Sequence, residues 1–275
     1  MDEKIESEKT DSEPVLLSHR EGRVLVLTLN RPDRLNALTP ELHARLHAAV
    51  EAAALDQDVG AVVVTGAGRA FCSGGDMKDD RSGPAAPRPG LEQRADELRH
   101  HAQTTMMLHT MPKPTLALIN GAAAGAGLAL ALACDLRIAS TDAVLRTAYA
   151  NVALSGDLGI SYFLTRLAGA GKACELMFLG DKIDATEALR IGLLSGVESP
   201  DTLHEVTMAL AKRLAEGPAV ALRYIKRNIV LAETASLEQV IDAEAYAMAR
   251  CGRTQDIKEA ALAFREKRPP KFSGV

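Results

Sequence analysis

The stretch TLALINGAAAGAGLALALAC, residues 115–134, decides how the rest of the chain is interpreted. Only Thr115 and Asn120 among its residues carry a polar side-chain group, and its length would span a bilayer. Its three glycines and its Asn-Gly step instead break the run into pieces. The sequence therefore predicts a buried strand over 115–120, a turn over 121–124 and a small-residue helix over 125–133.

The segments around this stretch alternate between strand and helix patterns. Thr39-Pro40-Glu41 is a helix start, because Thr caps helices, Pro suits the first helical position and an acid suits the first turn. From about residue 200 only amphipathic helices are expected. Strands are predicted over 23–30, 61–65, 136–140 and 143–147, and further helices over 91–111, 158–168 and 171–179. The fold class is α/β with an α-helical C-terminal section.

Charge and cysteine content narrow the class of protein. The formal net charge of −4 comes entirely from residues 1–14, which we expect to be a disordered acidic tail without the features of a secretory signal. No basic stripe follows, so nucleic acid is not an expected partner. The cysteines form no CxxC pair, which is typical of free thiols in a reducing compartment and indicates a cytoplasmic protein without a membrane partner. These cysteines are Cys72, Cys134, Cys174 and Cys251.

Two glycine-rich turns, in residues 62–78 and 115–129, are candidates for the chemistry. Neither has the third glycine of a dinucleotide fingerprint, and neither is a phosphate-binding Walker loop. Each can present a main-chain N–H where no Cβ blocks approach, and two such donors on one oxygen make an oxyanion hole. Alternatively, the small residues only allow a helix and a strand to pack closely. The spacing by itself gives these two interpretations similar weight.

Several motifs together resemble the crotonase, or enoyl-CoA hydratase/isomerase, family. They occur in the family's order and cover about residues 15–272. The resemblance implies a spiral of ββα units with a helical C-terminal trimerisation region, assembly into homotrimers or dimers of trimers, and an acyl-CoA thioester as substrate, without a separate cofactor. The motifs are NRPDRLNALT (30–39), VVVTGAGRAFCSGGDMK (62–78), PKPTLALINGAAAGAGLALALACDLRIAS (112–140), LTRLAGAGKACELMFLG (164–180) and the KRPPKF ending.

The resemblance also implies positions for the substrate. The thioester carbonyl would lie between the N–H groups of Gly75 and Ala126. Phe264 and Lys267 match positions that in relatives reach the CoA of a neighbouring subunit, whereas Arg34 and Lys78 could equally be solvated loop cations. The full set implied to bind substrate or CoA is Arg34, Leu35, Ala37, Gly74, Asp76, Met77, Lys78, Gly125, Phe264 and Lys267.

The chain departs from the family at two important positions. Hydratases of the family use two glutamates, and the matching residues here are Ala129 and Tyr149, neither of which suits base catalysis at neutral pH. Asp157, eight residues past Tyr149, resembles the aspartate of double-bond isomerases, including ring-opening isomerases of phenylacetate-type pathways, and that of certain aroyl-CoA dehalogenases. Its alternative role is the N-cap of the helix expected over 158–168, accepting from the N–H of residue 159 or 160.

These observations predict an enzyme that isomerises an enoyl-CoA with Asp157 as the base and Tyr149 shaping the pocket or holding the acid. The alternatives are a hydratase with an unusual residue set, an acyl-CoA binder without chemistry, and a dehalogenase or decarboxylase. The expected divisions are a tail (1–14), a spiral core (15–200) and a helical region (201–275). His100 and His101 are candidates for substrate contact or for solvated surface, and His43 and His47 lack the remaining ligands of a zinc site, so no metal is expected.

Overall fold

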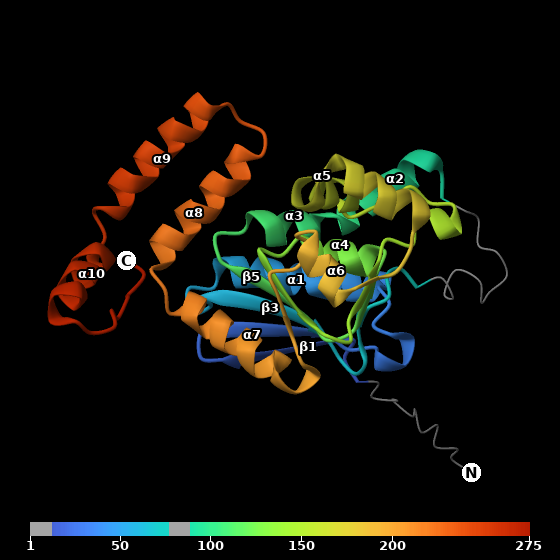
Figure 1. Cartoon of the computed structure of the whole chain (residues 1–275), viewed down its shortest axis with the longest axis horizontal. Helices are drawn as coiled ribbons and strands as arrows, with labels where there is room; N and C mark the ends of the chain where they lie inside the picture. The colour runs from blue at the N-terminus through green and yellow to red at the C-terminus, as the bar shows by residue number, and fades with distance from the viewer. Residues whose placement is uncertain (1–12, 77–88) are drawn as a thin grey trace, which may run out of the picture.

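The computed structural model describes residues 13–76 and 89–275 (Figure 1). Two sheets form the centre of the molecule. In the larger sheet the strand order is β1-β2-β3-β5-β7-β10, with β1 antiparallel to β2 and the remaining neighbours parallel. Its strands are β1 (Leu16–Glu21), β2 (Val24–Leu29), β3 (Ala61–Gly66), β5 (Thr115–Ile119), β7 (Leu136–Ser140) and β10 (Gly196–Glu198).

The smaller sheet has the order β4-β6-β8-β9. Each of its first three strands follows directly on a strand of the larger sheet, so β3 leads to β4, β5 to β6 and β7 to β8. The chain therefore advances through repeated strand–strand–helix units, which confirms the predicted ββα spiral. The strands of this sheet are β4 (Ala70–Cys72), β6 (Ala122–Ala124), β8 (Val144–Arg146) and β9 (Ile183–Asp184).

Helices cover both sheets and continue beyond them. The first helix, α1, begins as the sequence predicts, because the Thr39 hydroxyl accepts from the N–H of Leu42 at 3.2 Å and Pro40 is the first helical residue. The helices are α1 (Pro40–Leu55), α2 (Leu91–His101), α3 (Gln103–Thr110), α4 (Ala126–Leu132), α5 (Ile160–Leu179), α6 (Ala185–Arg190), α7 (Pro200–Ala215), α8 (Ala219–Ala232), α9 (Leu237–Cys251) and α10 (Gln255–Glu266), with short 3-10 turns at Pro32–Arg34 and Ala150–Val152.

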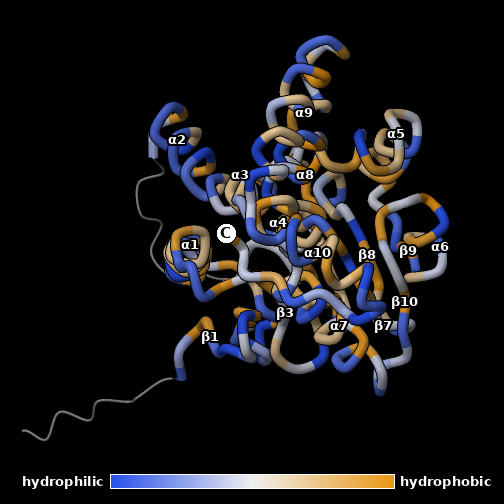
Figure 2. The backbone as a smooth tube through the Cα atoms, turned by 90° about the vertical axis from the view of Figure 1, so that its left-hand side faces the viewer, coloured by the Kyte–Doolittle hydropathy of each residue, from blue (hydrophilic) through white to orange (hydrophobic). Residues whose placement is uncertain are grey.

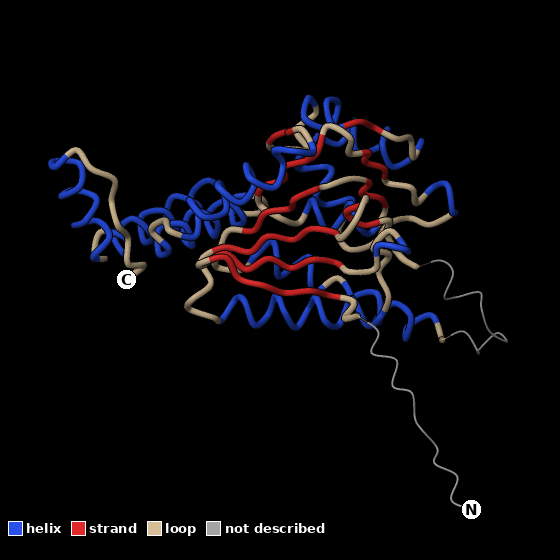
Figure 3. The backbone as a smooth tube through the Cα atoms, turned by 90° about the horizontal axis from the view of Figure 1, so that it is seen from below, coloured by secondary structure: helices blue, strands red, loops and turns tan. Residues whose placement is uncertain are grey.

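Apolar side chains are buried on the two faces of the larger sheet. One cluster lies between the two sheets and includes the inner faces of α1, α4 and α5. A second joins Val24, Val63 and Leu116 of the sheet to Leu203 and Met208 of α7. Because α7 packs on the sheet, it belongs structurally with the core, whereas α8, α9 and α10 extend to one side of the molecule (Figures 1 and 3).

Three expected boundaries were wrong. Residues 122–124 are not a turn but strand β6, which is formed by pairing with β4 and β8, partners distant in sequence. The single helix expected over 91–111 divides at Ala102 into α2 and α3. The helix expected from 158 begins at Ile160, because Leu158 and Gly159 have left-handed φ angles of 51° and 82°.

The decisive stretch 115–134 is thus divided among β5, β6 and α4. Among the described residues, no helix combines the length and the apolar character that crossing a bilayer requires. The expected acidic tail lies almost wholly outside the described residues.

Candidate active site

The first glycine turn leads out of β4 and pairs with the segment before α1. The N–H of Leu38 donates to the carbonyl of Gly74 at 2.8 Å, and the N–H of Asp76 donates to the carbonyl of Leu38 at 3.1 Å. In such a parallel bridge the intervening residue, Gly75, directs its own N–H away from Leu38. Among the described residues, nothing lies within 4 Å of a Cβ built on Gly75, so a side chain would fit there.

The second glycine turn joins β6 to α4. Gly125 has φ 53° and ψ −124°, a conformation that L side chains rarely adopt, and its N–H donates to the carbonyl of Arg146 at 3.0 Å. Ala126 is the first residue of α4, so its N–H has no acceptor within the helix. A Cβ at Gly74 would lie 3.5 Å from this nitrogen, which places the two turns against each other.

Close contact between α4 and β4 also requires glycine. A Cβ at Gly127 would lie 2.3 Å from the carbonyl oxygen of Cys72, closer than atoms can approach. The packing interpretation of the small residues is therefore correct for Gly127. It does not account for Gly75, where a side chain would fit.

Tyr149 connects Asp157 to the second glycine turn, because it contacts both. The Tyr149 hydroxyl donates to Asp157 Oδ1 at 2.6 Å, and a Cβ at Gly125 would lie 4.0 Å from the Tyr149 ring. Burial raises the pKa of Tyr149, and the neighbouring Asp157 charge raises it further. Tyr149 therefore remains a proton donor at neutral pH, and Asp157 is the acceptor.

The alternative role of Asp157 as a helix cap does not occur in the structure. The residue that caps α5 is Gly159, which has no side chain to accept from the first turn. Asp157 contributes only its main-chain carbonyl, which accepts from the N–H of Ile160 at 3.0 Å. Its carboxylate faces Tyr149 instead, so it remains next to the glycine turns.

The loop expected to hold CoA is fixed by side chains that sequence reasoning missed. Arg31 Nη2 lies 2.9 Å from Asp76 Oδ2, and Arg34 Nη2 lies 3.3 Å from Asp76 Oδ1. The Asn36 amide donates to the carbonyls of Ala67 and Ala70 at 2.9 and 2.8 Å. Both missed residues, Arg31 and Asn36, lie within NRPDRLNALT, and they keep Leu35 and Ala37 next to the first turn.

Comparisons with known proteins give independent information on the chain as a whole. Residues 19–275 match the family model described as enoyl-CoA hydratase/isomerase. A 1,2-epoxyphenylacetyl-CoA isomerase from Escherichia coli is 37% identical over 259 residues, covering 94% of this chain and 98% of that protein. The chain belongs to the enoyl-CoA hydratase/isomerase family.

Other members of the family carry hydratase names. An (E)-benzylidenesuccinyl-CoA hydratase from Thauera aromatica is 36% identical, covering 92% of this chain and 97% of that protein. A solved structure of a putative enoyl-CoA hydratase from Streptomyces coelicolor superposes with a TM-score of 0.89 at 35% identity and covers 98% of each chain. The family thus includes both reaction types among proteins similar to this one.

Within this family fold, Phe264 and Lys267 lie apart from the other predicted site residues. Both are exposed, at the end of α10, which lies across the molecule from α2 and α5 (Figure 1). A single chain does not bring them to Asp157, and their expected role involves a neighbouring subunit. Met77 and Lys78 lie outside the described residues.

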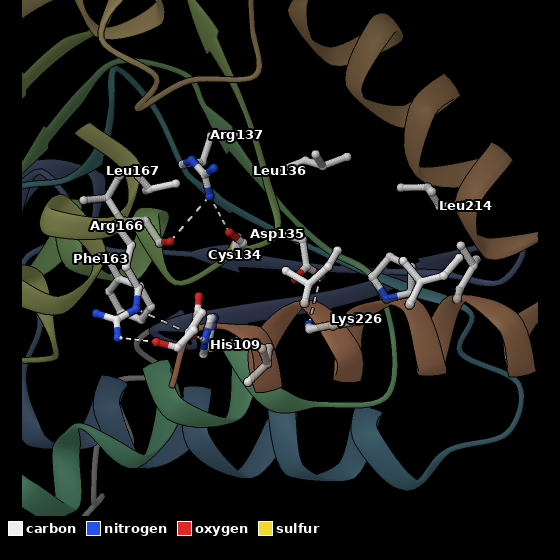
Figure 4. Close-up of a pocket in the computed structure, with 17 residues that line it drawn as sticks. His109, Cys134, Asp135, Leu136, Arg137, Phe163, Arg166, Leu167, Leu214 and Lys226 are labelled. Carbon is white, nitrogen blue, oxygen red and sulfur yellow. Dashed lines mark hydrogen bonds and ion pairs between the residues drawn. The ribbon is translucent and has the colours of Figure 1, made fainter. Parts of the chain in front are cut away.

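A separate cavity of about 330 Å³ lies between α5, α8 and the start of β7 (Figure 4). Leu132, Phe163, Leu167 and Ile229 contribute to its apolar walls. Its charged groups are already paired, and the clearest case is Lys226, which donates to Asp135 Oδ2 at 2.9 Å. The cavity does not include Gly75, Ala126 or Asp157 and lies at the opposite end of α4.

Metal ligation is not indicated by the described part of the chain, where no three His, Cys, Asp or Glu side chains are grouped to hold an ion. The His43 ring stacks on His101 and does not form a metal-ligand pair with His47. The expectation that the enzyme works without a metal stays a prediction.

Proposed function

We propose that the protein is an enoyl-CoA isomerase that moves a C=C bond between the β,γ and α,β positions of a CoA thioester. The main-chain N–H groups of Gly75 and Ala126 would donate to the thioester carbonyl oxygen. These bonds stabilise the enolate that forms when a proton leaves the α- or γ-carbon. Coenzyme A is then part of the substrate and not a resident cofactor.

Asp157 moves the proton in this proposal. Its carboxylate removes a proton from one carbon of the acyl group and returns it to the other, so one base serves both steps. Tyr149 donates to Oδ1 and leaves Oδ2 for the transfer. Because Tyr149 is buried and keeps its proton, it orients the carboxylate and does not compete as a base.

The observation that carries the proposal is the Tyr149–Asp157 hydrogen bond beside the Gly125 turn. Ala129, at a position where hydratases of the family use glutamate, has no ionisable group and is fully buried. Among the described residues at the site, the Asp76 carboxylate is paired with Arg31 and Arg34, which leaves Asp157 as the carboxylate available to the acyl group. This arrangement suits a proton shuttle better than water addition. The name of the Escherichia coli relative, an isomerase of an epoxide-bearing acyl-CoA, supports isomerisation over hydration as the class of reaction.

The substrate-binding surface would be completed by a neighbouring subunit. Arg34, Leu35, Ala37, Gly74, Asp76, Met77, Lys78 and Gly125 would line the CoA moiety in one chain, and Phe264 and Lys267 would come from the next. Large apolar side chains on α8, α9 and α10 are exposed in the single chain, as a homotrimer or a dimer of trimers requires. They include Ile225, Ile229, Leu237, Ile241, Tyr246, Met248 and Phe264.

The test uses 3-enoyl-CoA esters with a linear or a phenyl-bearing acyl group and follows formation of the conjugated 2-enoyl thioester. We expect Asp157→Asn to lower kcat by about 10²–10⁴-fold, the usual contribution of a positioned acid–base. Affinity for a saturated acyl-CoA should change less than about twofold. Asp142→Asn, at an exposed carboxylate, is the matched control and should remain as active as the wild type. Undiminished turnover in Asp157→Asn would refute the proposal.

A second candidate is water addition, favoured by the hydratase names of two similar proteins. The same reaction mixtures distinguish it, because a hydratase converts a 2-enoyl-CoA into a hydroxyacyl-CoA that chromatography separates. If the hydroxyacyl product forms faster than the double bond moves, hydration is the activity and the isomerase proposal is wrong.

A further inference from the structure

Helix α2 is attached to the protein in an unusual way. None of its residues is buried, and its first turn receives no side-chain cap from Gly90. Figure 2 shows it as a mostly hydrophilic helix standing beside α1 and α3. Its apolar residues Leu91, Ala95 and Leu98 recur at helical spacing, but Leu91 is exposed and Leu98 is only partly buried, so little apolar contact holds α2 to the core.

Histidine rings form the contact between α2 and α1 instead. The rings of His43 on α1 and His101 on α2 are stacked, with centroids 4.2 Å apart and planes inclined by only 4°. One turn further along α1, the His47 ring lies 6.0 Å from that of His100. His47 Nδ1 is buried and has no hydrogen-bond partner among the described residues. The seam thus consists of four titratable rings.

We propose that the stacked imidazoles of His43 and His101 are a pH-sensitive clasp that holds α2 against α1 beside the Asp157 turn. The clasp is closed while both rings are neutral. It opens when protons reach them, because two imidazolium rings cannot stack at this distance without strong repulsion.

The surroundings of the rings keep them neutral near pH 7. Burial, with a smaller contribution from the neighbouring His101, lowers the pKa of His43 to about 4. The pKa of His101 is lowered mainly by burial, with smaller contributions from Arg94 and His100, while the Glu97 and Asp157 charges oppose the shift. Both the burial of His43 and the adjacent His101 oppose protonation of this ring.

The sign of the pH effect follows from these directions. A histidine whose pKa is lowered on docking binds its proton more weakly in the docked state than in the released state. Below about pH 6.5, the ordinary value, each ring therefore weakens docking by about tenfold per pH unit until its own docked pKa is reached. We expect α2 to remain docked at pH 7 and to be released progressively between about pH 6.5 and 5.

The location of the clasp gives it a consequence for the site. His101 interacts electrostatically with Asp157, and α1 starts directly after Leu38, which pairs with Gly75. Release of α2 would therefore change the charge surroundings of the candidate base. The clasp itself rests on the histidine geometry and not on the proposed reaction, so the two can fail separately.

Hydrogen–deuterium exchange of the full chain tests the clasp. Protection of the amides at 94–101, corrected for intrinsic exchange, should fall at least about tenfold between pH 7 and 5.5 in the wild type. In His43→Phe/His101→Phe, which retains two flat rings without titratable nitrogens, it should fall less than about twofold. His204→Phe, at an exposed ring on α7, should behave like the wild type.

A second variant protects the test against misfolding. His101→Ala removes the stack, so protection at 94–101 should already be low at pH 7 while that of α4 remains. A wild-type helix that stays protected at pH 5.5 would overturn the proposal. An equal fall in wild type and the double Phe variant would also overturn it.

Discussion

At its N-terminal end α4 meets two glycine turns and presents main-chain N–H groups, whereas at its C-terminal end buried side chains bind the last carbonyls. Arg137 Nη1 donates to the carbonyls of Leu132, at 3.4 Å, and of Cys134. Lys226 reaches in from α8 to Asp135. Within the described residues, the C-terminal end of α4 is therefore covered by Arg137 and by the Lys226–Asp135 pair, whereas its N-terminal end faces the glycine turns and the Tyr149 ring. We call these the filled end and the clear end.

The difference shows that the clear end is a specific feature of the sequence. This chain uses arginine and lysine to satisfy backbone carbonyls when an end is to be buried. At the other end Gly74, Gly75 and Gly125 keep side chains away, at the cost of a strained backbone conformation for any other residue at Gly125. A helix end that served only packing would not need open space beside Gly75.

The largest stability effect is expected at the filled end. Lys226→Met removes the ammonium that donates to Asp135 Oδ2 at 2.9 Å and to the carbonyls of Leu108 and Lys113 at 2.8 and 3.1 Å. Urea unfolding should show a loss of about 3 kcal/mol, because the buried acceptors lose their partner. Lys212→Met, which breaks the exposed pair with Glu21, should cost less than about 1 kcal/mol. Equal losses in both variants would contradict the comparison.

Gly125→Ala should have the next largest effect, at the clear end. The added Cβ would meet only the Thr147 carbonyl at 3.6 Å and the Tyr149 ring at 4.0 Å, so space is not the obstacle. The φ of 53° with ψ of −124° is the obstacle, and holding alanine there costs about 1–3 kcal/mol. We expect a loss of about 2 kcal/mol in the free energy of unfolding. A variant as stable as the wild type would mean that the turn relaxes.

We expect the buried thiols to lower the stability of the fold at alkaline pH. This effect should be equal at the two ends of α4. Burial raises the pKa of Cys72, near the clear end, and of Cys134, at the filled end, to about 12. The unfolded chain loses these protons from about pH 9 upwards, so each thiol lowers stability by up to about 1.4 kcal/mol per pH unit above that value. Thermal unfolding of Cys72→Ala and Cys134→Ala should show equally reduced alkaline sensitivity. Reduction in only one of them would contradict this symmetry.

Among these variants, Gly75→Ala should have the smallest effect on the free energy of unfolding. It should nevertheless lower activity. No described residue lies within 4 Å of the position its Cβ would take, so the free energy of unfolding should change by less than about 0.5 kcal/mol. The methyl group would occupy the space into which the proposed thioester carbonyl fits. We therefore expect a lower kcat/KM with an unchanged unfolding midpoint. An unchanged kcat/KM would show that the space beside Gly75 is not used by the substrate.

The sequence predicts the regular elements where local signals agree with tertiary pairing. Thr39 and Pro40 mark the start of α1 correctly, and the glycines of 115–134 correctly divide that run into strand and helix. Strand β6 was missed because three alanines have little strand preference and are held by partners from β4 and β8. Such long-range pairing leaves no trace within a short window.

For the candidate site, the sequence identifies the residues but not their geometry. The sequence favours Asp157 as a base but leaves the helix cap as an alternative. The left-handed conformations of Leu158 and Gly159 displace the helix start and leave the carboxylate to Tyr149. Arg31 and Asn36 were overlooked because their partners, Asp76 and the carbonyls of Ala67 and Ala70, lie more than thirty residues away in sequence. The α1–α2 histidine seam is likewise invisible without the contact between the two helices.

The most direct test of the open end of α4 is a crystal structure with a saturated acyl-CoA, which the proposed reaction cannot convert. We predict the thioester carbonyl oxygen at about 2.7–3.1 Å from both the Gly75 and the Ala126 nitrogens, the range of oxyanion-hole donors. The Asp157 carboxylate should face the α- and γ-carbons of the acyl chain while it keeps its bond to Tyr149. A thioester bound elsewhere, with neither amide in contact with its oxygen, would contradict the account.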